Sequence, residues 1–240
     1  MDRAEYEAAT IAAAARSAVG RLLTSRFSAE LLAQIPSGSR YLGAGTEAVA
    51  LMTPAGDVVR IGLLIDGRAS VRANIPEVLQ ATSDVRIGPD WIAERLPYAP
   101  HDGITAADVA TLAERIAGRG YDLRDAQPEN LGRLSDASIV VTDAGSVRPD
   151  ATLELARVTK TAVEMSEPGR CYAGEVFDIR TARVYQCAGR DLTIAHRRSA
   201  FGNRSIGMMW KRNVSIAIAH DGQASIRMLP DDPDTVPPVA

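Results

Sequence analysis

The sequence is poor in the residues that mark several common classes of protein. Aromatic residues make up only 5% of its 240 positions, so a hydrophobic core must be built mainly from alanine, leucine, isoleucine and valine. The two cysteines, Cys171 and Cys187, have neither a second cysteine pair nor histidines at ligand spacing. This excludes a disulfide framework and a zinc site. We expect both thiols to be free and buried.

Membrane-spanning and targeting patterns are also missing. No apolar run approaches the roughly 18 residues that a transmembrane helix needs. Asp2, Glu5 and Glu7 precede a run of alanines, which is unlike the basic flank of a secretory signal. The net charge of -3 predicts no global attraction to nucleic acid or anionic membranes. With 46% apolar residues, we expect a soluble, globular, cytoplasmic protein with no membrane partner.

Hydrophobic periodicity changes near residue 37. A helical pattern in residues 2–23 and again near Leu31 is stopped by Pro36 and Gly38, whereas alternating residues follow from Arg40. A three-stranded meander is expected through Ile61, with a glycine-rich first turn and a Pro-Gly second turn. Further along we expect a short helix containing Glu77, Val78 and Leu79, strands over 85–87 and 91–96, and a helix that Thr105 and Asp108 cap.

The stretch from Asp125 to Asp143 carries the chemistry. Asp125 precedes Asn130 by five positions, and Asp143 follows the apolar run Ile139–Val141. Two carboxylates and a carboxamide placed in this way favour metal ligands beside a base, which is the layout of a phosphoryl-transfer site. Taken singly, however, an Asp near Pro and Asn is also typical of a turn, and Asp-Ala-Gly of a strand end.

The order of these parts resembles the protein-kinase-like superfamily. The segment from Leu123 to Leu131, which contains Asp125-Ala-Gln-Pro-Glu-Asn130, resembles the kinase catalytic loop, and Asp143-Ala-Gly145 resembles its metal-binding Asp-Phe-Gly. The resemblance covers about residues 39–147. It implies a minimal, divergent kinase of the bacterial or bacteriophage type, working in the cytoplasm of the bacterium or of the phage's host.

The resemblance also implies roles for residues in the first part of the chain. Gly43 and Gly45 would line a loop over the ATP phosphates, and Arg60 would stand where the family has lysine. Glu77 would form an ion pair with Arg60. An alternative for Glu77 is a carboxylate favoured by the helix dipole at a helix N-terminus. Residues Glu94 to Leu96 would form the segment that contacts adenine.

Further roles implied by the resemblance fall in the Asp125–Asp143 stretch. Asp125 would orient the attacking hydroxyl and accept its proton. Asn130 and Asp143 would ligate magnesium, with ATP as the second cofactor. Because Arg60 does not have the geometry of a lysine ammonium, the same residues are compatible with a catalytically weak or inactive, pseudokinase-like binding or structural protein.

The expected fold class is α+β, with a kinase-like two-lobed fold that has a truncated second lobe. We expect a helical extension at 1–36, an N-lobe-like β meander with a short helix at 37–97 and an abbreviated C-lobe at 98–166. A β-rich appendage at 167–229 and a disordered acidic, proline-containing tail at 230–240 would follow. The helix that Asp150 caps is expected to run to Met165, and Asp221-Gly222 predicts a hairpin.

Residues 180–212 contain eight lysines or arginines against one acid, Asp191. One interpretation is a solvated sheet face balanced by acids elsewhere in the chain. The other is a contact for an acidic protein, a phosphorylated substrate or nucleic acid, with Tyr185, Phe201 and Trp210 available for stacking. The function expected overall is a magnesium- and ATP-dependent transfer of phosphate to a hydroxyl, of a protein substrate in the first place. The alternative is the pseudokinase-like protein that docks a partner on this basic segment.

Overall fold

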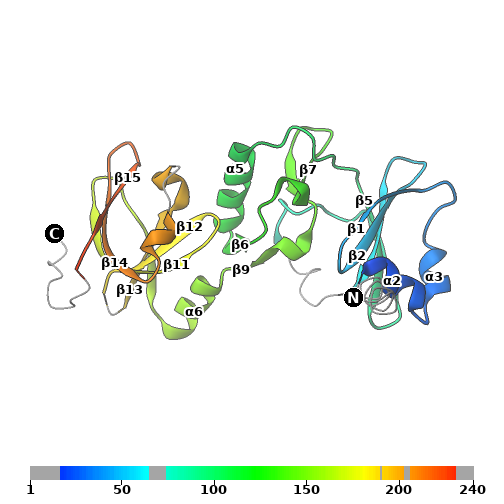
Figure 1. Ribbon diagram of the computed structural model, residues 1–240, viewed down its shortest axis with the longest axis horizontal. Coiled ribbons are helices and arrows are strands. Elements are labelled where there is room, and N and C mark those ends of the chain that lie inside the picture. Colours follow the sequence, from blue (N-terminus) through cyan, green and yellow to red (C-terminus); the bar gives the residue numbers. More distant parts are fainter. Residues whose placement is uncertain (1–16, 65–73, 190, 203–205, 231–240) are drawn as a thin grey trace, which may run out of the picture. The chain divides into compact units, whose positions relative to one another are not determined.

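The computed structural model describes residues 17–64, 74–189, 191–202 and 206–230 (Figure 1). The predicted helical residues before Ser17 and the acidic tail after Pro230 lie outside this part of the chain. The chain forms two compact units, and each is assembled from two segments. Unit 1 comprises Met1–Asp102 and Gly132–Ala144, and unit 2 comprises Gly103–Leu131 and Gly145–Ala240. Both units contain sheets and helices, which makes the protein α+β.

Unit 1 is built around an antiparallel five-stranded sheet with strand order β1-β2-β3-β5-β4. The predicted meander and the two later strands are confirmed. Turns at Thr53–Gly56 and Gly88–Asp90 join neighbouring strands, and both contain glycine with positive φ. The strands are β1 (Arg40–Ala44), β2 (Ala48–Met52), β3 (Val58–Leu63), β4 (Ser83–Ile87) and β5 (Trp91–Leu96).

The two faces of this sheet differ because successive side chains of a strand alternate between them. Val59, Ile61 and Ala93 lie on one face, in a buried cluster with Leu22 and Leu31 of two helices. These helices are α2 (Ala18–Thr24) and α3 (Ser28–Leu32), drawn in blue beside the sheet in Figure 1. The opposite face carries the residues that alternate with this set, among them those of the candidate site.

The short helix predicted over Glu77–Leu79 is wrong. These residues form a turn and then a parallel bridge in which Val78 pairs with Val141. The Val141 N–H donates to the Glu77 carbonyl and the Leu79 N–H donates to the Val141 carbonyl, both at 2.8 Å. Backbone groups that would be hydrogen-bonded within a helix are instead hydrogen-bonded to β8 (Ile139–Val141). Strand β8 forms a hairpin with β7 (Leu131–Arg133).

In unit 2, helix α5 (Ala106–Ala117) leads to a short antiparallel pair of strands. The predicted capping box is confirmed, because Thr105 and Asp108 exchange both hydrogen bonds at the start of α5. The pair consists of β6 (Tyr121–Leu123) and β9 (Val147–Pro149). Between them the chain forms two 3₁₀ turns, η1 (Pro128–Asn130) and η2 (Ala144–Ser146), and the β7–β8 hairpin.

Helix α6 (Ala151–Thr159) begins as predicted and ends early. Its N-cap Asp150 accepts the Thr152 N–H at 2.9 Å, but the expected continuation to Met165 is wrong. Lys160 adopts the left-handed conformation at φ 58°, which stops the helix. The next residues form β10 (Ala162–Met165), which pairs in parallel with β13. The apolar spacing that predicted a longer helix therefore serves a strand whose partner lies later in the chain.

The rest of unit 2 is a six-stranded sheet with order β10-β13-β12-β11-β14-β15. Val176, Val184, Ile216 and Phe201 are central to its buried cluster. The hairpin predicted at Asp221-Gly222 is confirmed between β14 and β15. In the described part of the chain, no helix is long and apolar enough to cross a membrane. The remaining elements are β11 (Cys171–Ile179), β12 (Arg183–Cys187), β13 (Leu192–Arg197), η3 (Arg198–Phe201), η4 (Ile206–Met209), β14 (Arg212–Ile218) and β15 (Ala224–Met228).

Two predictions about side chains in this sheet are wrong. Cys171 and Cys187 are free but exposed, because the apolar residues of the sheet fill its core without them. Tyr185 and Phe201 were expected to be available for stacking, yet each is only 1% exposed. Of the three aromatic residues considered for that role, Trp210 is the exposed one, at 54%.

Candidate functional site

Arg60 lies in the middle of β3 and forms a buried ion pair across the sheet. It stands opposite Glu94 in the β3–β5 register, and its Nη1 donates to Glu94 Oε2 at 2.8 Å. The two side chains are 11% and 7% exposed. A charged pair that is shielded from water holds its geometry more firmly than an exposed one, because the desolvated charges have few other partners. The pair therefore fixes the guanidinium on the face of the sheet opposite α2 and α3.

Two more carboxylates act on the same guanidinium. Burial lowers the pKa of Arg60 from its ordinary value, whereas the nearby charges of Asp143 and Glu47 raise it. Glu47 belongs to the turn between β1 and β2, and Asp143 follows β8. The hydrogen bonds of Val141 to the Glu77–Leu79 segment hold the end of β8 two residues before Asp143. Arg60 and Asp143, far apart in the sequence, are thus brought together within unit 1.

Glu77 lies in unit 1 and is buried, with 2% of its surface exposed. Its backbone carbonyl anchors β8, as described above. The structure places it in a turn, which removes the helix-dipole alternative considered from the sequence. Its pairing with Arg60 stays a prediction, since the ion pair established for Arg60 is the one with Glu94.

Two glycines at the end of β1 and in the turn to β2 have open space around them: Gly43 lies in β1, and Gly45 lies in the turn. A Cβ added at Gly43 or Gly45 would meet nothing within 4 Å, and neither residue has a left-handed φ. Gly43 follows a shift in the β1–β2 register, where glycine is common. At Gly45, neither packing nor backbone conformation explains the glycine. The Gly45 N–H donates to the Ala48 carbonyl at 2.9 Å, which closes the turn.

The sequence did not predict the ion pair of Glu94, or any place for Gly62 in this site. Glu94 was expected to contact adenine, but its carboxylate is the partner of Arg60. Gly62 lies so close to Arg60 that an added Cβ would be 3.2 Å from the guanidinium Nη1 and 2.9 Å from the Ala48 Cβ. The signal for both is the strand period: Arg60, Gly62 and Glu94 share one face once β3 is paired with β5.

Leu96 and Glu94 lie in a strand that has neighbours on both sides. β5 pairs with β3 along its whole length and with β4 as far as Arg95. The backbone groups of Glu94 and Leu96 are therefore in strand ladders, and their predicted contact with adenine stays a prediction. A segment that leaves the sheet begins after Leu96, at Pro97.

The loop that carries Asp125 and Asn130 belongs to unit 2. Asn130 Nδ2 donates to Asp125 Oδ2 at 2.7 Å and to the Asp125 carbonyl at 3.2 Å. The carboxamide thus spans the loop and orients the carboxylate. Asp125 is exposed, and the Oδ1 atom of Asn130 is an oxygen of the type that magnesium accepts. Asp143 belongs to unit 1, whereas Asp125 and Asn130 belong to unit 2. The predicted grouping of the three residues therefore stays a prediction.

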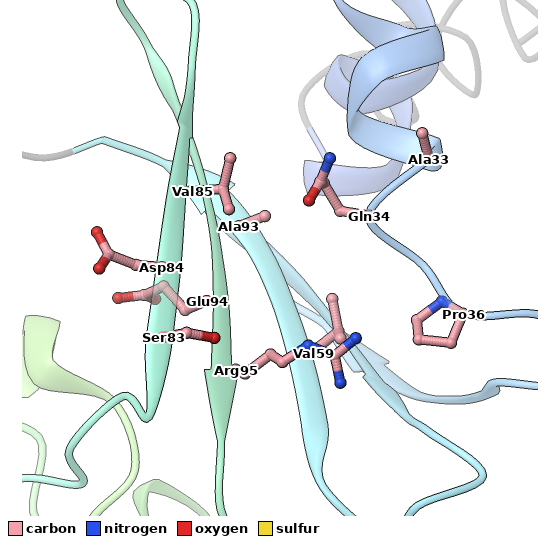
Figure 2. Close-up of a pocket in the computed structure, with 10 residues that line it drawn as sticks. All are labelled: Ala33, Gln34, Pro36, Val59, Ser83, Asp84, Val85, Ala93, Glu94 and Arg95. Atoms are coloured by element: carbon pink, nitrogen blue, oxygen red, sulfur yellow. The ribbon is translucent and has the colours of Figure 1, made fainter.

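A pocket of about 350 Å³ lies on the other side of the five-stranded sheet. Figure 2 shows Gln34 and Pro36 facing Val85, Ser83 and Arg95, whereas the carboxylates of Glu94 and Asp84 point to the opposite side. The pocket therefore does not coincide with the Arg60 cluster. Within the described ranges, no group of three or more His, Cys, Asp or Glu side chains is arranged to hold a metal ion.

Each unit thus has its own group of candidate residues. Unit 1 contributes a buried arginine ringed by carboxylates beside an open glycine turn, and unit 2 contributes a carboxylate held by an asparagine. Compared with known proteins, the chain matches no protein-family model and no curated sequence.

Proposed function

We propose that the protein is an ATP- and magnesium-dependent phosphotransferase with a kinase-like two-lobed fold, which acts on a hydroxyl of a protein substrate. The observation that carries this proposal is the buried Arg60–Glu94 ion pair on one face of the five-stranded sheet, with the charge of Asp143 acting on the same guanidinium. A cation for phosphate oxygens and a carboxylate for a metal are the two charges that Mg-ATP requires of a protein.

The order of elements along the chain supports the same proposal. In protein kinases a glycine-rich loop covers the phosphates, a lysine on the third strand contacts them and two later residues, Asn and Asp, hold magnesium. Here the glycine turn joins β1 to β2, Arg60 lies on β3, and the Asp125–Asn130 loop precedes the hairpin that ends at Asp143. Each of these positions was predicted from the sequence, whereas the helix expected at Glu77 does not form.

The residues present fit the chemistry of the two cofactors. Oxygen ligands suit magnesium, and the Asp143 carboxylate and the Asn130 carboxamide supply them. Magnesium, when bound, would neutralise charge on the phosphates. Arg60 would bind phosphate oxygens, and the open space at Gly43 and Gly45 would allow them to approach the backbone. Asp125 would accept the proton of the attacking hydroxyl, held in orientation by the Asn130 amide.

A test compares phosphate transfer in the wild type and in an Asp143→Ala variant. Both proteins are incubated with magnesium and labelled ATP, alone and with lysate. We expect transfer to fall at least about a hundredfold in the variant, because a metal-binding carboxylate is lost. The thermal shift produced by Mg-ATP should fall with it.

Asp90→Ala is the matched control, since Asp90 is an exposed aspartate in the turn between β4 and β5. This variant should keep wild-type transfer. Equal transfer by wild type and Asp143→Ala would refute the assigned role. A wild type that shows neither transfer nor a magnesium-dependent thermal shift would remove the nucleotide site altogether.

A second candidate function is a pseudokinase-like protein that binds an anionic partner through residues 180–212. The observation in its favour is Trp210, which is exposed and has Lys211 Nζ 4.8 Å from its ring centroid. The basic excess is smaller than the sequence suggests, because Arg180 pairs with Asp178 and Arg183 with Glu114. Arg197, Arg198, Lys211 and Arg212 are exposed in the described part of this segment.

A further inference from the structure

Strand β6 ends two residues before Asp125, and it is too small to hold that loop by itself. It has three residues, and β9, its one ladder partner, has three as well. An isolated two-stranded pair is at best marginally stable in water. Beyond β6 the Arg124 N–H donates to the Ser146 carbonyl at 2.8 Å, and the chain then enters the exposed loop. The position of Asp125 therefore depends on what supports β6.

The turn between β11 and β12 supplies that support. Thr181 Oγ1 donates to the Leu123 carbonyl at 2.5 Å, and the Thr181 N–H donates to Asp122 Oδ1 at 3.4 Å. Both acceptors belong to β6. Arg180 Nη1 is 4.0 Å from Asp122 Oδ2, and its Nη2 is 2.7 Å from Asp178 Oδ2. One turn of the six-stranded sheet thus contacts the backbone and the buried side chain of the strand that leads into the loop.

Asp122 is the central residue of this contact. It is 6% exposed, and burial raises the pKa of its carboxyl, whereas the Thr181 N–H and Arg180 lower it. A carboxylate that is removed from water needs such partners, because an unpaired buried charge is costly. The pairing therefore favours one placement of β6 against the turn.

The same sheet also holds the elements on either side of β6 and β9. Tyr185 Oη donates to Asp150 Oδ2 at 2.6 Å, at the N-cap of α6 directly after β9. Thr152 Oγ1, in the first turn of α6, donates to Asp178 Oδ2 at 2.5 Å. Arg183 Nη1 donates to Glu114 Oε2 of α5 at 2.5 Å. The elements α5, β6 and α6, which lie near the loop along the chain, are each joined to the sheet by side-chain hydrogen bonds.

We propose that the six-stranded sheet is a positioning element for the Asp125 loop, and that Thr181 and Asp122 are its positioning residues. This inference rests on the proposed function for its catalytic consequence, but its structural content stands on the contacts within unit 2. From the sequence alone, the β-rich segment was expected to be an appendage. In the proposal it supports the Asp125 loop instead.

Thr181→Val tests the proposal, because valine keeps the shape of threonine and removes the hydroxyl that reaches Leu123. The first readout is hydrogen exchange, which needs no activity. Amides of Leu123, Arg124 and Asp125 should exchange at least about tenfold faster in the variant, as the end of β6 loosens. Thr181→Ser keeps the hydroxyl and should restore wild-type exchange. Thr193→Val is the matched control, at a buried threonine of β13 in the same sheet.

The second readout is the kinetics of label transfer. We expect Thr181→Val to lower kcat about tenfold to a hundredfold, because misplacing a reacting group is costly. KM for ATP should stay within about twofold, since ATP is assigned to unit 1. Thr181→Ser should recover most of kcat.

The outcomes separate this inference from the proposed function. Unchanged exchange at Leu123–Asp125 in Thr181→Val, or the same change in Thr193→Val, would overturn the positioning role. Faster exchange with an unchanged kcat would also overturn the positioning role, because phosphate transfer would then not depend on the support that the turn gives to the Asp125 loop. A wild type without transfer, together with the expected exchange pattern, would refute the phosphotransferase and leave the structural support of the loop intact.

Discussion

An arginine at position 60 changes what the site can do at the scale of a single residue. Its planar guanidinium can bond Glu94 and still offer donors to a second group, which a lysine ammonium does less rigidly. The attraction of Asp143 and Glu47 keeps further negative charge nearby. Three carboxylates, Glu94, Asp143 and Glu47, act on Arg60, which favours a ligand that brings a metal ion with its phosphates.

His196 is a second residue whose environment has a measurable consequence. Gln186 Nε2 donates to the Gly174 and Val214 carbonyls, so its Oε1 accepts a hydrogen bond from His196 Nε2 at 2.9 Å. The Nδ1 atom of His196 is buried and makes no hydrogen bond within the described part of the chain. Burial lowers the pKa of His196 from 6.5 to about 4. The imidazole is therefore neutral at pH 7.

We predict that this histidine destabilises the fold as the solution is acidified. Between pH 6.5 and 4 the unfolded chain binds a proton that the folded chain does not, so the stability present above pH 6.5 is lost as pH falls. The loss attributable to His196 is about 3 kcal/mol at pH 4. Urea unfolding at pH 7 and at pH 4.5 measures it. His196→Gln should show a smaller decrease than the wild type between these two pH values.

His220, which is exposed after β14, provides the control. His220→Gln should keep the pH dependence of the wild type. If His196→Gln and wild type lose equal stability between the two pH values, His196 does not titrate as the structure implies.

At the scale of elements, the turn between β1 and β2 contains a glycine, Gly45, that neither packing nor backbone conformation requires. We predict that Gly45→Ala changes the free energy of unfolding by less than about 0.5 kcal/mol, because the added Cβ meets no neighbour. The affinity for Mg-ATP should fall about tenfold, since the methyl group occupies space that the proposed phosphates approach. Thermal unfolding and ATP titration measure the two effects.

Gly207→Ala is a suitable comparison, because that glycine is equally open and lies in η4 of unit 2. It should affect neither quantity. Unchanged ATP affinity in Gly45→Ala would contradict a role for the turn in phosphate binding.

The accuracy of the element predictions followed from the range of the interactions that decide them. Strands β1–β5 and the capping box at Thr105 depend on nearby residues, so alternation and cap spacing predicted them. The turn at Glu77 and the strand at Ala162–Met165 depend on partners far along the chain, β8 and β13. Pro76 predicted the first of these helices and apolar spacing the second, and neither signal contains information about a partner strand so far along the chain.

At the scale of the whole molecule, charge separates the two candidate functions. The net charge of -3 gives no general attraction to polyanions, so any binding must come from a local surface. If the second candidate is right, we expect single-stranded nucleic acid to bind with an affinity that falls steeply with salt. Changing Arg197 and Lys211 to Glu should lower the slope of log affinity against log salt by about two.

Trp210→Ala distinguishes stacking from charge in the same titration. It should weaken binding by about 1–3 kcal/mol without changing the salt slope, because an aromatic ring contacts a base rather than a phosphate. Wild-type and double-variant proteins with the same slope would exclude these cations as the contact. Fluorescence anisotropy over a range of salt concentrations measures both.

The sequence by itself determined the α+β class, the strands of the five-stranded sheet, the hairpin at Asp221-Gly222, and the candidate residues and their order, because these follow from local periodicity, capping and turn chemistry. Only the tertiary structure decided that Glu94 is the partner of Arg60, that Asp143 approaches the same guanidinium and that Thr181 supports the strand before Asp125. Each of these contacts joins residues that are distant along the chain. Their approach depends on strand pairing and on the burial of charge, which spacing in a single sequence does not specify.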